Sequence, residues 1–171
     1  MKISKIKSTE FHPYFKTYMD KVGDIHLLDA LQKGAKETLF FFESIPESKL
    51  IYRYSEGKWT IKDILLHMID TERTFCYRAL NFARSKNSKL DGFDENVYVE
   101  NAQANSRTIA ELIAEYNAVR NATILLFDSF SDEALKSNGM ANNAILSVRA
   151  AGFIICGHET HHKQIIKERY L

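Results

Sequence analysis

The chain has 171 residues, of which 45% are hydrophobic and 26% are charged. This length and composition are typical of one globular domain that buries a substantial core. The 23 basic and 22 acidic residues give a formal net charge of +1, so charge gives no indication of a nucleic acid or a polyanionic substrate.

Other features of the composition indicate a cytoplasmic protein. Residues 1–7 are basic, but the apolar run and small-residue cleavage site of a signal peptide do not follow them. No apolar run approaches the roughly 18 residues that are needed to cross a bilayer. Cys76 and Cys156 lie far apart and form no CxxC pair, as is typical of small core residues in a reducing compartment. We therefore expect neither a membrane nor a nucleic acid as a partner.

The first predicted helix follows an N-terminal arm. Residues 1–22 mix charged with aromatic side chains, and we expect one short helical turn there. Apolar residues then recur at spacings of three and four, which predicts a helix over 24–44. Asp24 is the expected N-cap, and Pro46 lies just beyond the end.

The second helix has a clear start. Thr60-Ile61-Lys62-Asp63 resembles a capping box, and an apolar stripe follows it over about 61–83. Residues 86–106 are polar and irregular. At about 3.3 Å per residue this segment is long enough to run the whole length of a helix. It therefore permits a second and a third helix that run parallel to each other.

Two further helices are predicted in the second half of the chain. Apolar residues stay in helical register over 107–128, and residues 131–133 are expected to begin a short extra turn. A loop is predicted over 137–143, where asparagine and glycine are frequent. Ser147 is the expected cap of a last helix over 148–168.

These patterns predict the fold class. Strand signals are nearly absent, because no segment shows sustained alternation of apolar and polar residues. Four amphipathic helices in a chain of this length predict an all-α four-helix bundle that occupies residues 1–171 as a single domain.

Histidines cluster near the end of the chain, at positions 158, 161 and 162. At about 100° per residue, His158 and His162 lie in the middle of the apolar stripe of the last helix, and His161 lies at its edge. Two imidazoles buried there need hydrogen-bond partners or a shared metal, because unsatisfied burial costs about 1–3 kcal/mol each. The i, i+4 spacing suits a divalent metal; a pair of satisfied core histidines is the alternative. His161 is expected to lie in solvent or next to a metal-coordinating residue, without binding the metal itself.

A metal needs a third ligand, and His67 is the candidate. It flanks the apolar stripe of the second helix, which suits a ligand in a cleft with one coordination position open to solvent. The same position also suits a surface histidine paired with Asp70, and periodicity does not choose between the two. His12 and His26 have no partner at ligand spacing and are expected on the surface.

Other motifs with catalytic meaning are missing. The sequence has no glycine-rich phosphate loop and no GxSxG elbow. Asp94 and Glu95 lie in the long connection within reach of a site. A solvated pair of loop charges is the commoner explanation for them.

Several stretches together resemble one known family, the DinB/YfiT-like metalloproteins, also called thiol-S-transferase-like proteins. The resemblance covers roughly residues 14–171. The matching segments are Gly57-Lys58-Trp59-Thr60-Ile61-Lys62-Asp63, His67, Asp70-Thr71-Glu72-Arg73, Tyr77-Arg78-Ala79-Leu80, Gly92-Phe93-Asp94-Glu95-Asn96, Ser147-Val148-Arg149-Ala150, Gly157-His158-Glu159-Thr160-His161-His162 and Ile166-Lys167-Glu168-Arg169-Tyr170-Leu171.

The resemblance implies a fold and a metal site. The implied fold is a four-helix bundle in up-down-down-up order, with a long crossover between helices 2 and 3. The implied ligands of one divalent metal, nickel or zinc, are His67, His158 and His162, with a water completing the site. Asp70 or Glu159 would orient a ligand imidazole through its other ring nitrogen. Many members are homodimers.

The resemblance implies less about activity. The leading expectation is a metal-dependent transferase that conjugates a low-molecular-weight thiol to small electrophiles in detoxification or stress. A metal-dependent hydrolase of a small substrate is the alternative enzyme. A non-enzymatic, metal-containing stress or interaction module is the third hypothesis. Three neutral imidazoles suit both kinds of enzyme, and no second motif selects between them.

Overall fold

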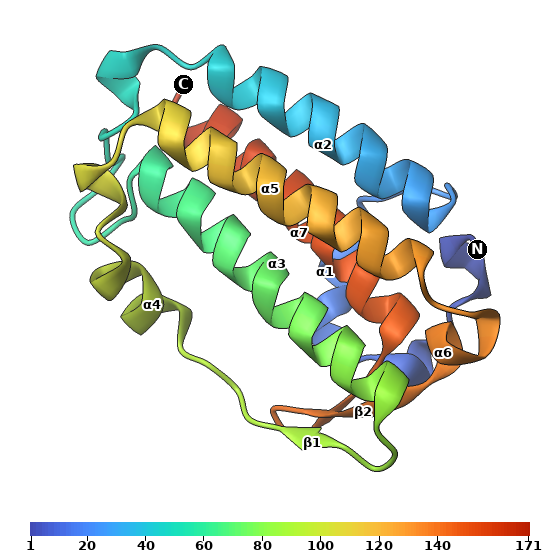
Figure 1. Ribbon diagram of the computed structural model, residues 1–171. Helices are drawn as coiled ribbons and strands as arrows, with labels where there is room; N and C mark the ends of the chain where they lie inside the picture. The colour runs from blue at the N-terminus through green and yellow to red at the C-terminus, as the bar shows by residue number, and fades with distance from the viewer.

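Four long helices form the body of the protein in a computed structural model that describes all residues, 1–171. They are α2 (Leu27–Glu43), α3 (Ile61–Arg84), α5 (Ile109–Asp128) and α7 (Val148–Arg169). Figure 1 shows that α2 and α7 run in one direction and that α3 and α5 run in the other. This is the predicted up-down-down-up four-helix bundle.

The helix starts follow the local sequence signals in three of the four cases. Thr60 and Asp63 form the predicted capping box of α3, in which each side chain accepts the other residue's backbone N–H, at 3.0 and 2.9 Å. Thr108 begins α5 with a second capping box. The Ser147 hydroxyl accepts the backbone N–H of Ala150 at 3.1 Å and caps α7 as predicted.

The predicted start of α2 was wrong. The helix begins at Leu27 and its N-cap residue, His26, makes no side-chain capping bond. The Asp24 carboxylate instead accepts hydrogen bonds from the Lys2 ammonium at 3.2 Å and from the Ser4 backbone at 3.4 Å. The N-terminal arm folds back beside this residue and takes the carboxylate that the helix was expected to use.

The long crossover contains structure that was not predicted. Between α3 and α5 lie a two-residue strand, β1 (Lys89–Leu90), a helix, α4 (Glu95–Ala102), and a 3-10 turn (Ala104–Ser106). The Asp94 carboxylate caps α4 by accepting the N–H groups of Asn96 and Val97. Figure 1 shows this segment returning along the bundle beside α3, so the parallel arrangement of α3 and α5 is confirmed.

A small sheet replaces part of the predicted loop over 137–143. Strand β2 (Asn138–Ala141) pairs in parallel with β1 and antiparallel with β3 (Ala144–Ser147). Asn142 and Asn143 form the turn with φ angles of 50° and 59°, the left-handed region that asparagine tolerates. The short turn predicted at 131–133 is present as helix α6 (Asp132–Lys136).

The N-terminal arm is packed against α7. Three 3-10 turns lead into a short helix, α1 (Lys16–Met19). Glu10 accepts a hydrogen bond from Ser147 at 2.9 Å and forms an ion pair with Arg149, which fixes the arm to the start of α7. A Cβ atom on Gly157 would overlap the backbone carbonyl of Tyr18, so glycine permits this close approach. The contact places Tyr18 beside His158.

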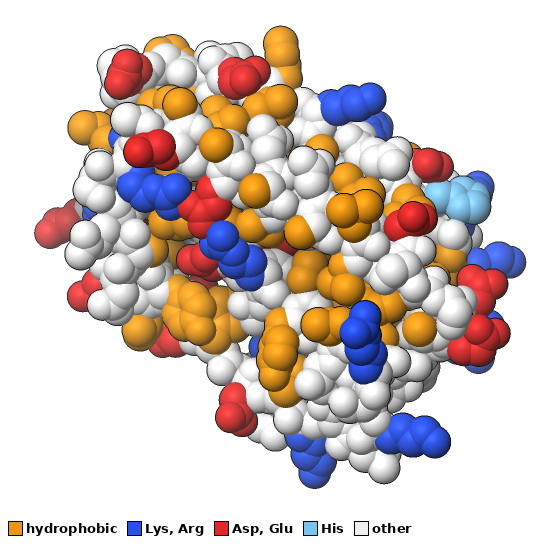
Figure 2. All heavy atoms as spheres, viewed as in Figure 1, with side chains coloured by type: hydrophobic (Ala, Val, Ile, Leu, Met, Phe, Trp, Pro, Cys, Tyr) orange, Lys and Arg blue, Asp and Glu red, His pale blue; other side chains and the backbone are white.

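The core of the bundle is apolar at both ends and charged in the middle. Along α3, α5 and α7, the buried apolar residues belong to two clusters, one toward each end of the bundle. The buried residues Glu72, Arg120 and Glu159 lie between these clusters on the three helices. On the face shown in Figure 2, acidic and basic side chains are interspersed. None of the helices has the length and apolar character needed to span a membrane.

Candidate metal centre

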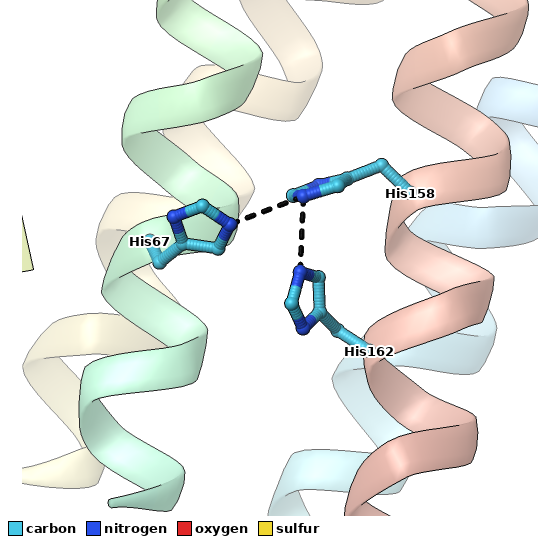
Figure 3. Close-up of side chains that lie close together, drawn as sticks. All are labelled: His67, His158 and His162. Carbon is cyan, nitrogen blue, oxygen red and sulfur yellow. Dashed lines mark hydrogen bonds between the residues drawn. The ribbon is translucent and has the colours of Figure 1, made fainter. Parts of the chain in front are cut away.

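Three histidines from two helices converge on one point. The Nε2 atom of His158 lies 3.1 Å from Nε2 of His67 and 3.0 Å from Nε2 of His162. One nitrogen from each ring lies within 4.8 Å of the others. Figure 3 shows His67 reaching across from α3 toward the two rings of α7. The three residues predicted as ligands are thus brought together, and we call them the histidine triad.

The positions of the triad follow from helix geometry. His158 and His162 lie one turn apart on α7, on the face that meets α3. His67 was expected at the flank of the core, but the side chain is only 8% exposed because the Trp59 ring packs against it, with ring centroids 4.7 Å apart. On the other side, the ring of Tyr18 stands edge-on to His158 at 5.3 Å.

All three imidazoles are held in their neutral form. Burial lowers the pKa of His67 from 6.5 to about 4. Burial, with the neighbouring imidazoles adding to it, lowers the pKa values of His158 and His162 well below 6.5. Each ring therefore carries a lone pair at pH 7, which is the state that a metal requires of its ligands.

The arrangement fits a cation better than it fits hydrogen bonds. An imidazole nitrogen has a single in-plane site, for a proton or for a lone pair, yet Nε2 of His158 faces two other nitrogens. It cannot form a linear hydrogen bond with both. With bonds of about 2.0–2.1 Å, neighbouring nitrogens of a tetrahedral zinc site lie roughly 3.3 Å apart. Two of the three spacings, 3.1 and 3.0 Å, are close to this value and all three lie within 4.8 Å, so the triad could hold a divalent metal.

The lowered pKa values predict how the metal-free protein responds to acid. Below pH 6.5 the unfolded chain protonates its histidines, whereas His67 stays neutral in the folded state down to about pH 4. The free energy of unfolding is therefore expected to fall as pH decreases through this interval. Urea unfolding in the presence of a chelator at several pH values measures the effect. A His67→Gln variant should lose part of the dependence, and an identical profile for both proteins would contradict the prediction.

The two carboxylates expected to orient the triad, those of Asp70 and Glu159, pair with arginines instead. The side chain of Glu159 accepts hydrogen bonds from Arg120 at 2.7 Å and from Tyr116, and Asp70 pairs with Arg73 at 3.3 Å. No hydrogen bond joins either carboxylate to a histidine ring of the triad, so that expectation was wrong. Glu159 follows His158 in the chain and is therefore rotated by about 100° toward the middle of the bundle.

The other histidines lie apart from the triad. His161 is half-buried, with its ring 5.3 Å from that of Tyr18 and 5.2 Å from that of His162, which agrees with the edge position expected for it. His26 is exposed as predicted. His12 is also exposed, but it lies on the wall of the cavity beside the triad, a position that no local pattern in the sequence indicates.

A cavity of about 580 Å³ opens beside the triad, and all three ligand candidates line it. This volume is within the range of small-molecule sites. The wall is built from the N-terminal arm, α3, the crossover and the β2–β3 hairpin. Its apolar part includes Phe15, Tyr18, Phe75, Phe93 and Ile145, and its polar part includes Arg78 and Asn142. Neither cysteine lines the cavity, and burial raises the pKa of the Cys76 thiol to about 12, so both serve as packing residues.

Comparisons with known proteins agree with the fold. Residues 30–166 match the family model of the DinB superfamily. The curated proteins contain no match to the chain. Among solved structures, the chain is similar to YfiT from Bacillus subtilis, with a TM-score of 0.75 and 17% sequence identity over 83% of this chain and 82% of that one. YfiT is described as a probable metal-dependent hydrolase with an unusual four-helix bundle topology. Because the family model spans well over half of its length, the chain belongs to the DinB superfamily.

Proposed function

We propose that this protein is a metal-dependent hydrolase of a small organic substrate, with one divalent metal held by His67, His158 and His162. The observation that carries the proposal is a triad of neutral imidazoles that opens on a cavity of about 580 Å³. No cysteine or carboxylate joins the triad as a fourth ligand. Structural zinc sites have four protein ligands, whereas catalytic sites keep one position open.

The metal would supply a Lewis acid and a water whose pKa is lowered toward 7. The chain supplies the rest of the site. Trp59 and Tyr18 pack against the ligand rings and fix their orientation. The aromatic wall contributed by Phe15, Phe75 and Phe93 would bind the apolar part of a substrate and exclude bulk water. The description of YfiT as a probable metal-dependent hydrolase supports the same reaction class.

A thiol transferase is the second candidate. The cavity volume of about 580 Å³ is large enough for a small thiol beside a small electrophile. The thiol would have to come from a co-substrate, because burial raises the pKa values of both cysteines of the chain. Nickel or zinc suits the imidazole ligands in either reaction. A low-molecular-weight thiol and a homodimer remain predictions from the family resemblance.

One experiment separates these functions. Protein purified without an affinity tag is stripped of metal, reloaded with zinc or nickel, and incubated with chromogenic esters and amides. A bromobimane is tested in parallel, with and without small thiols. We expect metal-dependent turnover of an ester or amide without thiol, and its loss in His162→Ala. The exposed-site variant His26→Ala should retain it.

The other outcomes are equally informative. Turnover that requires a thiol would replace the hydrolase with the transferase. The absence of any turnover, together with unfolding of His162→Ala on loss of its metal, would indicate a structural metal and contradict both enzymes.

A further inference from the structure

Arg78 lines the same cavity as the triad, three turns further along α3. It follows His67 by eleven positions on α3, so it returns to within about 20° of the same helix face, roughly 16 Å along the axis. Thr71 and Phe75 occupy the same face between the two residues, and all four side chains line the cavity. The cavity therefore extends along α3 from the triad, past Thr71 and Phe75, to the guanidinium group of Arg78.

Arg78 differs from the other buried arginines because it has no carboxylate partner. Arg120 pairs with Glu72 and Glu159, and Arg149 pairs with Glu10. The side chain of Arg78 is 6% exposed, yet its only hydrogen bond is donated to the backbone carbonyl of Asp91 at 3.3 Å. Burial lowers the pKa of Arg78, and no neighbouring carboxylate acts in the opposite direction. Most of its five N–H donors have no protein partner and are open to the solvent of the cavity.

The surroundings orient the guanidinium without neutralising it. The ring of Phe75 lies 5.2 Å from the guanidinium carbon, and the ring of Phe93 lies 5.8 Å from it. Such cation–π contacts hold the group in place. They do not satisfy its in-plane donors, which are suited to a carboxylate or a phosphate. Glu95 is the one carboxylate on the cavity wall; it is exposed and forms no ion pair with Arg78.

We propose that Arg78 binds an anionic group of the substrate, a carboxylate or a phosphate, within the cavity that the triad also lines. The substrate is then an elongated molecule with three parts. Its oxyanion pairs with Arg78, its apolar middle lies against Phe15 and Phe75, and its reacting bond lies at the triad. No carboxylate of the protein pairs with this guanidinium, and a substrate anion would supply the missing countercharge on binding.

The inference takes the cavity to be the substrate site, as the proposed function does, but its test does not depend on turnover. The probes are 4-phenylbutyrate, 3-phenylpropylphosphonate and the neutral 4-phenylbutyramide. They are titrated into metal-free protein, in which no carboxylate can coordinate a metal. Trp59 is the single tryptophan of the chain and lines the cavity, so its fluorescence reports occupancy.

We expect at least one anionic probe to bind about tenfold to a hundredfold more tightly than the amide, the range that charge-assisted hydrogen bonds contribute. Tighter binding of 4-phenylbutyrate would indicate a carboxylate substrate, and tighter binding of 3-phenylpropylphosphonate would indicate a phosphate substrate. Arg78→Gln should abolish the preference, and Arg78→Lys should retain part of it. Arg84→Gln is the matched control, because Arg84 is exposed at the end of the same helix.

Equal binding of the amide and both anions by the unaltered protein would overturn the proposal. This comparison needs no variant, so it tests the proposal even if Arg78→Gln fails to fold. A preference that survives in folded Arg78→Gln would overturn it as well. A protein that prefers anions but hydrolyses nothing when loaded with metal would refute the proposed hydrolase and leave the anion site standing.

Discussion

Replacing Arg120 by methionine is expected to lower the free energy of unfolding by about 3–5 kcal/mol, the cost of breaking a buried ion pair from one side. Arg120 is 1% exposed, and its guanidinium donates to Glu72 at 2.8 Å and to Glu159 at 2.7 Å. Without it, Glu72 and Glu159 remain buried; the Tyr116 hydroxyl still donates to Glu159, but the one cation nearby is Lys163, at 3.9 Å from Glu159. Each carboxylate then has to be protonated or hydrated for the chain to fold.

Denaturant and thermal unfolding measure this effect. For a chain of this size, 1 kcal/mol corresponds to about 2–4 °C in Tm, so a decrease of roughly 6–20 °C is expected. Arg73→Met is the control, because Arg73 also links α3 to α5, through an ion pair with Glu115, but lies at a half-exposed position. This replacement should lower the free energy of unfolding by no more than about 1 kcal/mol. Adding Glu72→Gln and Glu159→Gln to Arg120→Met should restore part of the loss. Equal effects of the two arginine variants would contradict a buried network.

Replacing His158 by alanine is expected to weaken metal binding by more than about a hundredfold, since even residues that only orient a ligand contribute tenfold to a hundredfold. His158 is the central member of the triad and contacts both of the other nitrogens. Its removal leaves two imidazoles, too few to hold a metal with one open position. Competition against a chromophoric chelator measures the affinity.

His161→Ala is the matched control for this prediction, because His161 lies on the same helix and the same cavity wall but outside the triad. It should bind metal with the stoichiometry of the unaltered protein. Loss of binding in His161→Ala, or full binding in His158→Ala, would show that the metal uses a different ligand set.

Features with local signals could be predicted from the sequence. The caps at Thr60 and Ser147 are set by hydrogen bonds to residues three positions away, and both were predicted at the right residue. Features that depend on distant segments could not. Asp24 looked like a helix cap, but Lys2 and Ser4 of the folded-back arm occupy its carboxylate. The strands β1, β2 and β3 are two to four residues long, too short to show alternation.

The same distinction applies to the candidate site. His158 and His162 could be paired from their spacing alone, because both lie on one helix. Periodicity left His67 as either a ligand or a surface residue, and only the family resemblance selected it. The partner of Glu159 could not be predicted, since Arg120 lies on another helix, 39 positions earlier in the chain. Arg78 had a usable signal, namely its recurrence on the face of His67 after three turns.

We propose that one metal binds the Nε2 atoms of His67, His158 and His162. The most direct test is a ¹H–¹⁵N correlation spectrum of the six imidazole side chains, recorded during a titration with Zn²⁺. We expect the Nε2 signals of the triad to shift together and to stop changing at one equivalent, while the signals of His12, His26 and His161 keep their positions. Shifts that continue beyond one equivalent, or that affect the exposed histidines and leave the triad unchanged, would contradict the claim.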